Sequence, residues 1–172
     1  MAVKKKKGKV QKKPKVKKSP KVLKVAAPVT SKHQKVRFET TQGVFVAEIF
    51  SDVPVTAKNF LDLTASGFYD GLTFHRYEPG FVIQGGDPQG TGMGGSDKNI
   101  PLEITHYKHV KGALGMARSQ DPNSASSQFY VCLVDTPFLD KNYAVFGQVL
   151  EGFDKVQALR KGDKMTKVTI VE

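Results

Sequence analysis

The chain has 172 residues, which is enough for one domain with a buried core, and carries a net charge of +11. The charge is uneven, because residues 1–37 contain fourteen Lys, one Arg and no acid and so carry +15, which leaves −4 for residues 38–172. The single cysteine, Cys132, excludes an internal disulfide, and the apolar runs are far shorter than the roughly 18 residues of a membrane span, which favours a cytoplasmic protein without membrane contact.

Residues 1–34 form a Lys- and Pro-rich tail that we expect to be disordered, because it has almost no apolar surface to offset its ordering entropy. Such a tail serves either as a solubilising spacer or as an arm that binds polyanions such as DNA, RNA or the ribosome. In a bacterium this would place the protein at the nucleoid or ribosome, and in a eukaryote it could direct nuclear import. The absence of interleaved aromatics argues against base stacking. The lysines expected to contact polyanions are Lys4, Lys5, Lys6, Lys7, Lys12, Lys13, Lys17 and Lys18.

Residues 35–172 are expected to form the folded domain. In residues 35–50 apolar side chains alternate on both sides of the connection TTQG, which predicts a β-hairpin. Residues 54–66 begin with Pro and end before Gly67, which predicts a helix. The apolar face of that helix is expected to contain Ala57, Phe60, Leu61 and Leu63.

Short apolar segments separated by Gly, Pro, Asp and Asn fill most of the remaining chain. They predict strands at LTFHRY (72–77), GFVIQGG (80–86), GALGMAR (112–118), SQFYVCLV (127–134), YAVFGQVL (143–150) and KVTIVE (167–172). Residues 153–160 have helical spacing. Many short strands with two helices favour a closed β-barrel whose helices cover its openings.

Several kinds of site are excluded by residue type and spacing. Cys132 lies in an apolar run and is expected to be a packed strand residue rather than a nucleophile. His106 and His109 are three residues apart, but no further Cys or His supports a metal site. The glycines of GTGMGG (90–95) match a dinucleotide-binding pattern, but the following SDKNIPLEIT has no helical period, so we predict a flexible surface loop and no cofactor.

The segment FHRYEPGFVIQGGDP, residues 74–88, suits a reaction that has no covalent step. Rotation about an X–Pro bond between its cis and trans forms crosses a barrier of about 18–20 kcal/mol, although the free energies of the two forms differ by only about 0.5–1 kcal/mol. The twisted nitrogen regains its lone pair, so a donor placed there stabilises the twisted state alone. Arg76 supplies a permanent cation, expected on the strand face of Phe74, while Phe81 offers an apolar wall and Gln84 an amide. From this segment alone, a surface Arg beside core aromatics explains the pattern equally well.

Motifs along the whole domain resemble the cyclophilin family of peptidyl-prolyl cis-trans isomerases. FHRYEPGFVIQGGDPQGTG, GALGMARSQDPNSASSQFYV, FLD and YAVFGQVLEG follow the family's order and spacing, and MARSQDP is more similar to the bacterial members. The resemblance implies a mainly β fold, a closed eight-stranded antiparallel β-barrel capped by two α-helices, with the substrate groove on its outer surface. It further implies a monomer that needs no cofactor.

The resemblance also assigns roles to individual residues. It implies that Arg76, Phe81 and Gln84 are catalytic. The substrate-binding residues that it implies are Val82, Tyr130 and Leu139 beside Phe81 in the proline pocket, Gln128 beside Gln84, Ala117, Arg118 and Ser119 in the segment that pairs with the substrate backbone, and Phe138 and Tyr143 where many members have tryptophan and histidine.

Five of these positions, including Tyr143, depart from the usual family residue. Val82 is smaller than methionine, and Tyr130 adds a hydroxyl to the usual phenylalanine. Phe138 lacks the indole N–H that cyclosporin uses in sensitive members, so we expect weak cyclosporin binding. Arg118 replaces asparagine and adds a charge that would favour acidic or polar peptides.

Three functions fit the sequence. The first is an isomerase that acts on proline-containing peptides and on unfolded or flexible protein clients, and so assists folding. The second is a binding module for proline-containing loops in which turnover is incidental. The third is a nucleic-acid-associated protein whose main function is nucleic-acid binding by the tail, which carries the barrel with it.

Overall fold

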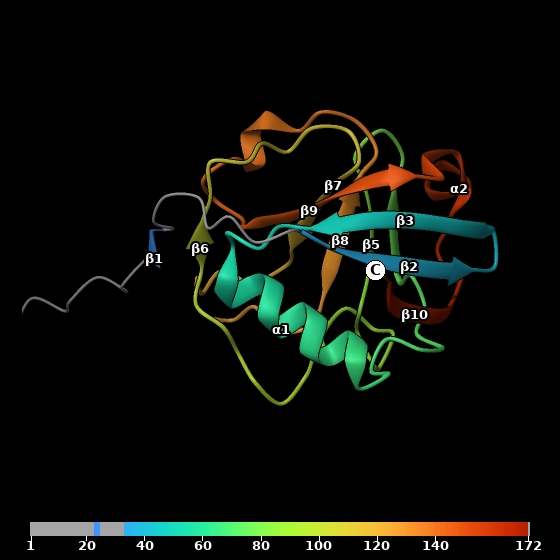
Figure 1. Ribbon diagram of the computed structural model, residues 1–172, viewed down its shortest axis with the longest axis horizontal. Helices are drawn as coiled ribbons and strands as arrows, with labels where there is room; N and C mark the ends of the chain where they lie inside the picture. Colours follow the sequence, from blue (N-terminus) through green and yellow to red (C-terminus); the bar gives the residue numbers. More distant parts are fainter. Residues whose placement is uncertain (1–22, 25–32, 172) are drawn as a thin grey trace, which may run out of the picture.

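The computed structural model describes residues 23–24 and 33–171, so most of the Lys-rich tail, including the eight lysines named above, lies outside the described residues. Eight antiparallel strands form one sheet in the order β10-β2-β3-β9-β7-β8-β5-β4 (Figure 1). Their bounds are β2 Gln34–Thr40, β3 Gly43–Ile49, β4 Arg76–Glu78, β5 Val82–Gly85, β7 Ala113–Met116, β8 Phe129–Cys132, β9 Val145–Glu151 and β10 Met165–Val171. The prediction of a mainly β fold with eight antiparallel strands is confirmed.

Three further short elements were not expected from the sequence. Strand β1, Leu23–Lys24, lies within the tail and pairs in parallel with β6, Glu103–Ile104, in a separate two-stranded sheet. A 3₁₀ turn, η1, spans Pro137–Leu139 and carries two of the residues expected in the substrate groove.

The predicted hairpin is formed by β2 and β3, and its alternation sets the core face. Val36 and Phe38 from β2 and Phe45 and Ala47 from β3 are all 0% exposed. Phe38 is the register partner of Phe45, and the two rings stack with centroids 4.4 Å apart. A one-residue slip would turn this whole apolar set towards solvent, so the pattern fixes the register.

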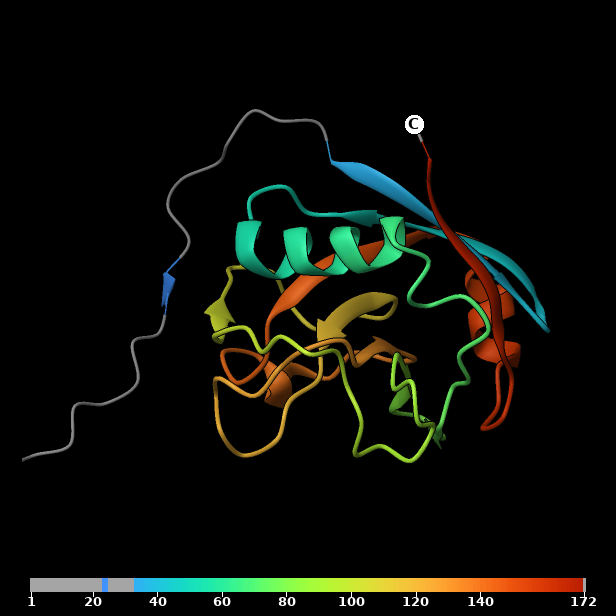
Figure 2. The same cartoon turned by 90° about the horizontal axis from the view of Figure 1, so that it is seen from below.

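Helix α1, Pro54–Ala65, packs against β9 and β10, whereas helix α2, Phe153–Ala158, packs against β3 (Figure 2). The helix expected at residues 54–66 is confirmed, and it ends in a Schellman motif in which Gly67 has φ +74° and the Phe68 N–H donates to the Leu63 carbonyl. Phe60 is buried and lies 5.0 Å from the Phe146 ring. Leu63 is only half-buried, as is Leu61.

The predicted closed barrel is wrong, because the sheet is an open half-barrel with β10 and β4 as its edges. Residues 71–74 do run beside residues 162–165, but a single bridge, Thr73 with Lys164, and four backbone hydrogen bonds join them. Gly71 has φ +81°, which breaks the extended backbone at the start of this contact. Strand β4 then has only three residues and pairs with β5 alone, so no continuous ladder closes the sheet.

The strands predicted at residues 72–77, 80–86, 112–118, 127–134 and 143–150 are present but shorter than expected, since the backbone hydrogen-bond ladders end where the Gly and Pro turns begin. The strand predicted at residues 167–172 is also present, but as β10 it begins two residues earlier, at Met165. Among the described helices, none combines the length and apolar character needed to cross a membrane.

Candidate active site

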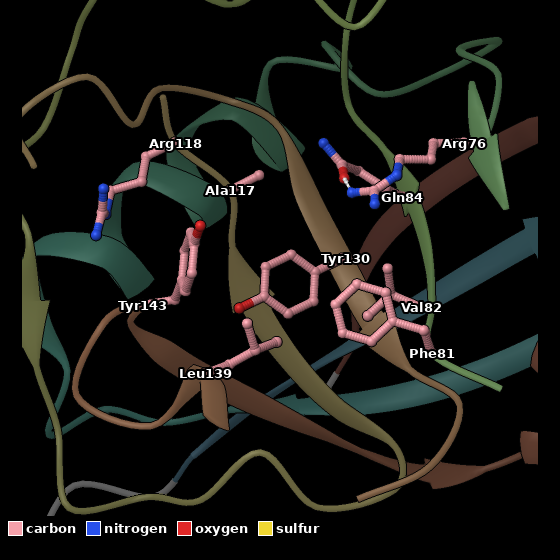
Figure 3. A pocket seen from close by; sticks show the side chains of 9 residues that line it. All are labelled: Arg76, Phe81, Val82, Gln84, Ala117, Arg118, Tyr130, Leu139 and Tyr143. Carbon is pink, nitrogen blue, oxygen red and sulfur yellow. Dashed lines mark hydrogen bonds between the residues drawn. The ribbon is translucent and has the colours of Figure 1, made fainter. Parts of the chain in front are cut away.

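The residues expected around the proline pocket come together on one face of the half-barrel. Arg76 on β4 and Gln84 on β5 are direct register partners across the antiparallel pair. One pocket is lined by Arg76, Phe81, Val82, Gln84, Ala117, Arg118, Tyr130, Leu139 and Tyr143. Figure 3 shows Tyr130 at its centre, with Arg76 and Gln84 on one side and Arg118 and Tyr143 on the other.

A directional chain of hydrogen bonds orients the two glutamine amides. Arg76 Nη1 can only donate, and it lies 3.3 Å from Gln84 Oε1. Gln84 Nε2 then donates to Gln128 Oε1 at 2.9 Å. Gln128 Nε2 in turn donates to the carbonyls of Gly92 and Gly94. The guanidinium is therefore tied through both amides to the glycine-rich loop.

The cation at Arg76 faces the apolar part of the pocket. Its Cζ lies 5.8 Å from the centroid of the Phe81 ring, and its Nε contacts Glu78 Oε1 at 3.4 Å. Both partners of this ion pair are about half exposed, so it orients the guanidinium more than it stabilises the fold. Among the described residues, none accepts a hydrogen bond from Arg76 Nη2, which leaves a donor for a ligand.

Phe74 does not share the face of Arg76, contrary to expectation. Phe74 is 0% exposed in the core, whereas Arg76 is exposed. Strand β4 starts only at Arg76, and the backbone N–H of Phe74 donates to the Asp163 carbonyl instead. The period-two alternation therefore does not extend back to residue 74.

The floor of the pocket is apolar and its walls are braced. Val82 is 2% exposed and Tyr130 is 5% exposed. Phe81 stacks on Phe138 with centroids 5.6 Å apart, and Phe138 is 66% exposed. Phe138 therefore braces the Phe81 wall from outside the pocket, while Leu139 forms the opposite wall.

Arg118 builds the rim that lies across from Arg76. Its Cζ lies 4.7 Å from the centroid of the Tyr143 ring, and its Nη2 donates to the Asn142 carbonyl at 2.7 Å. Its Nη1 donates to the carbonyl of Ser119. The Arg118 guanidinium thus stabilises the rim by hydrogen bonds to backbone carbonyls and by its contact with the Tyr143 ring. No described carboxylate forms an ion pair with it.

The segment Ala117–Ser119, expected to pair with a substrate strand, already uses two of its own donors. The Ala117 N–H donates to the Gln128 carbonyl, and the Ser119 N–H donates to Ser124 Oγ. Within the described part of the chain, the Arg118 N–H has no such partner. One backbone donor, rather than three, is available to a bound peptide. A second hollow beside this segment is lined by Ser119, Gln128 and the glycine-rich loop.

Asp87 organises the glycine-rich loop and was not singled out from the sequence. Its carboxylate is 1% exposed and accepts backbone N–H groups from Gln89, Thr91, Gly92 and Gly94. Burial alone would raise the pKa of Asp87, but these hydrogen bonds outweigh it and lower the pKa below its ordinary value. Residues 90–95 form a loop as predicted, and no helix directly follows them, whereas the flexibility of the loop stays a prediction.

His109 also has a different role from the metal ligand that was considered and set aside. It is 1% exposed, and its ring nitrogens lie 2.9 Å from Asp140 Oδ1 and 2.9 Å from the Tyr130 hydroxyl. No cluster of metal-ligating side chains is found in the part of the chain that the structure describes. Cys132 is a packed strand residue as predicted, and burial raises the pKa of its thiol to about 11.

This arrangement combines an apolar notch, a cation at its edge and oriented amides, and it offers no described nucleophile within the notch. Such a set cannot form a covalent intermediate, but it can hold a small ring and place a donor beside it. These are the requirements for rotating an X–Pro bond.

Comparisons with known proteins agree with this geometry. The family model described as cyclophilin type peptidyl-prolyl cis-trans isomerase/CLD matches residues 35–172. A peptidyl-prolyl cis-trans isomerase from Synechococcus elongatus is 45% identical over 136 residues, covering 77% of this chain and 93% of that protein. One from Arabidopsis thaliana is 46% identical over 132 residues, covering 73% and 82%.

Solved structures agree as well. The crystal structure of a cyclophilin-type peptidyl-prolyl cis-trans isomerase from Cryptosporidium parvum matches with a TM-score of 0.78 and 33% identity, covering 82% of this chain and 99% of that chain. The same protein in the presence of the dipeptide Ala-Pro matches with a TM-score of 0.76 and 34% identity, covering 81% and 99%.

The fold and the pocket define a protein that acts on peptide bonds preceding proline. The chain belongs to the cyclophilin family of peptidyl-prolyl cis-trans isomerases. Bacterial and plant relatives match at nearly equal identity, so the similarity to bacterial members in particular stays a prediction.

Proposed function

We propose that the pocket binds the pyrrolidine ring of an X–Pro peptide and that Arg76 donates a hydrogen bond to the prolyl nitrogen as the bond twists. The observation that carries this assignment is the position of the Arg76 guanidinium, 5.8 Å from the Phe81 ring and hydrogen-bonded to Gln84. In the planar amide the nitrogen lone pair is delocalised, so this bond exists only in the twisted state.

The chain Arg76–Gln84–Gln128 preorganises that donor. A catalytic dipole that is already aligned costs no reorganisation when the charge distribution changes. Gln84 fixes the position of the guanidinium, and Gln128 fixes Gln84 through the carbonyls of the glycine-rich loop. No described residue accepts a hydrogen bond from Arg76 Nη2, so this nitrogen is the proposed donor to the ligand.

The substrates of this site are proline-containing segments of unfolded or flexible protein clients. The relative from Cryptosporidium parvum was crystallised in the presence of Ala-Pro, which supports a proline peptide as the ligand of the matching groove. The exposed Phe138 and the uncompensated Arg118 favour clients with an apolar or acidic residue near the proline.

A protease-coupled assay with a proline tetrapeptide nitroanilide tests the proposal on the full-length protein. We expect catalysis with kcat/KM in the ordinary enzyme range, about 10⁴–10⁸ M⁻¹s⁻¹. The absence of any acceleration over the uncatalysed reaction would remove the assigned function of the pocket.

Phe138→Trp is expected to strengthen cyclosporin binding by about tenfold. The position is exposed beside the pocket wall, so an indole fits there without repacking the core, and it restores an N–H donor. Isothermal titration of wild type and variant measures the change. Phe138→Leu, which adds no donor, is the matched control and should not bind more tightly than wild type.

The tail is proposed to bind polyanions, because residues 1–37 carry +15 and no acid while residues 38–172 carry −4. Deletion of residues 1–34 should abolish retention on heparin or nucleic acid at low salt and flatten the dependence of binding on salt. An unchanged salt slope in the truncated protein would discard this proposal. We expect kcat/KM to be unchanged, because the tail is proposed to address the isomerase to polyanions and not to take part in catalysis.

A further inference from the structure

A buried chain of hydrogen bonds lies beneath the proline pocket. The Tyr130 hydroxyl is 2.9 Å from His109 Nε2, and His109 Nδ1 is 2.9 Å from Asp140 Oδ1. The same carboxylate oxygen accepts the backbone N–H of His109 at 2.9 Å. The Tyr130 and His109 residues are 5% and 1% exposed, so water does not compete for these bonds.

The chemistry of the three groups sets the direction of the chain. Burial raises the pKa of Asp140, but hydrogen bonds from His109 and Lys108 outweigh it, so the pKa is lowered and the carboxylate is an acceptor. Burial also lowers the pKa of His109, so its ring is neutral at neutral pH. A neutral ring that donates from Nδ1 to Asp140 must accept at Nε2, and therefore the Tyr130 O–H donates to His109.

The same chain connects the floor of the pocket to its wall. Asp140 directly follows η1, which carries the wall residue Leu139. The carbonyl of His109 accepts the backbone N–H of Thr136 at 2.7 Å, just before the same turn. His109 thus contacts the floor residue Tyr130 through its ring, and through its backbone carbonyl it contacts Thr136, next to the turn that carries the wall residue.

The neighbouring backbone is fitted to the tyrosine. A Cβ at Gly115 would overlap the hydroxyl end of the Tyr130 ring, so the absence of a side chain there makes room for the phenol. The Tyr130 ring is therefore held in one position, between Gly115 and His109.

We propose that His109 and Asp140 are positioning residues for the isomerase, which fix the Tyr130 ring as the pocket floor and hold its hydroxyl proton away from the substrate. The floor then presents a hydrocarbon face to the pyrrolidine ring although it is a tyrosine. This inference rests on the proposed function of the pocket, since positioning matters only if the pocket binds proline.

The first test needs no substrate and no variant. Long-range ¹H–¹⁵N correlation spectra of the wild-type protein report which ring nitrogen of His109 carries the proton. The proposal requires protonated Nδ1 and unprotonated Nε2 at neutral pH. A protonated Nε2 would make Tyr130 an acceptor with its own proton free to face the pocket, and would overturn the proposal.

The second test separates positioning from general stability. His109→Phe keeps a buried ring but removes both side-chain hydrogen bonds, whereas His109→Gln supplies one donor and one acceptor. We expect His109→Phe to weaken the binding of an Ala-Pro peptide about fivefold, the ordinary net effect of losing one buried hydrogen bond, with kcat changed by less than about twofold. His109→Gln should restore affinity to within about twofold of wild type.

A double-mutant cycle supplies the decisive control. In a Tyr130→Phe background there is no hydroxyl to hold, so His109→Phe should change peptide affinity by less than about twofold. An equal loss of affinity in both backgrounds would show that His109 acts on the fold in general and would overturn the proposal. Wild-type activity is measured in the same series, so a failure of the proposed function is distinguishable as inactivity of every protein, whatever the tautomer.

Discussion

Replacement of Arg76 by alanine is expected to lower kcat/KM by roughly 10²-fold or more. The guanidinium is proposed to donate to the prolyl nitrogen only while the bond is twisted, so the loss should fall on kcat and not on the affinity for the peptide. Affinity should stay within about threefold, because Val82 and Tyr130 still form the apolar floor. A protease-coupled assay and a peptide titration measure the two quantities.

Two matched variants sharpen this result. Arg76→Lys keeps a charge but loses the rigid fork that contacts Gln84, so we expect an intermediate loss. Arg37→Ala removes a similar half-exposed arginine, which pairs with Glu39 two residues later just as Arg76 pairs with Glu78. Arg37→Ala should have wild-type activity. An Arg76→Ala enzyme within about twofold of wild type would disprove the mechanism.

Asp87→Ala is expected to lower the free energy of unfolding by about 3 kcal/mol, because it leaves four backbone N–H groups of the glycine-rich loop without their acceptor. Chemical denaturation measures this change. The same variant should reduce kcat/KM, since Gln128 is anchored to the carbonyls of that loop. Asp62→Ala, which removes an exposed carboxylate from α1, is the control and should cost less than about 1 kcal/mol.

The contribution of Asp87 should also depend on pH with a definite sign. The pKa of this carboxyl is lowered in the folded protein below its ordinary value of 3.8, so the folded state binds a proton less readily than the unfolded state. The stabilisation is therefore complete at neutral pH and is lost as the pH falls through and below that value. The difference in unfolding free energy between wild type and Asp87→Asn should shrink towards low pH. A difference that stays constant between neutral and strongly acidic pH would contradict this assignment.

The local sequence pattern was sufficient to predict those helices and strands whose formation depends mainly on their own residues. The alternation of Val36, Phe38, Phe45 and Ala47 predicted a hairpin with the correct buried face, and Gly67 marked the end of α1. The residues expected in the pocket do lie together. They were predicted from the motif resemblance, because no periodicity in the sequence could identify them.

Features that depend on distant pairing could not be predicted in this way. Whether the sheet closes is decided by the contact between residues 71–74 and 162–165, and no local pattern encodes its limited length. The role of Asp87 depends on a loop folding back over seven residues, and that of His109 on Asp140, 31 residues away. A polar residue beside a glycine-rich run was the available signal for Asp87. The Tyr130 hydroxyl, which needs a buried partner, was the signal for His109.

This groove rotates X–Pro bonds and does not merely hold them. Two-dimensional NMR exchange on a proline peptide, with the full-length protein at a small fraction of the peptide concentration, reports binding and cis–trans rotation in the same sample. We predict exchange cross-peaks between the cis and trans signals, which are absent without protein because uncatalysed rotation takes tens of seconds or longer. Shifted peptide signals without exchange cross-peaks would identify a binding module and contradict the account.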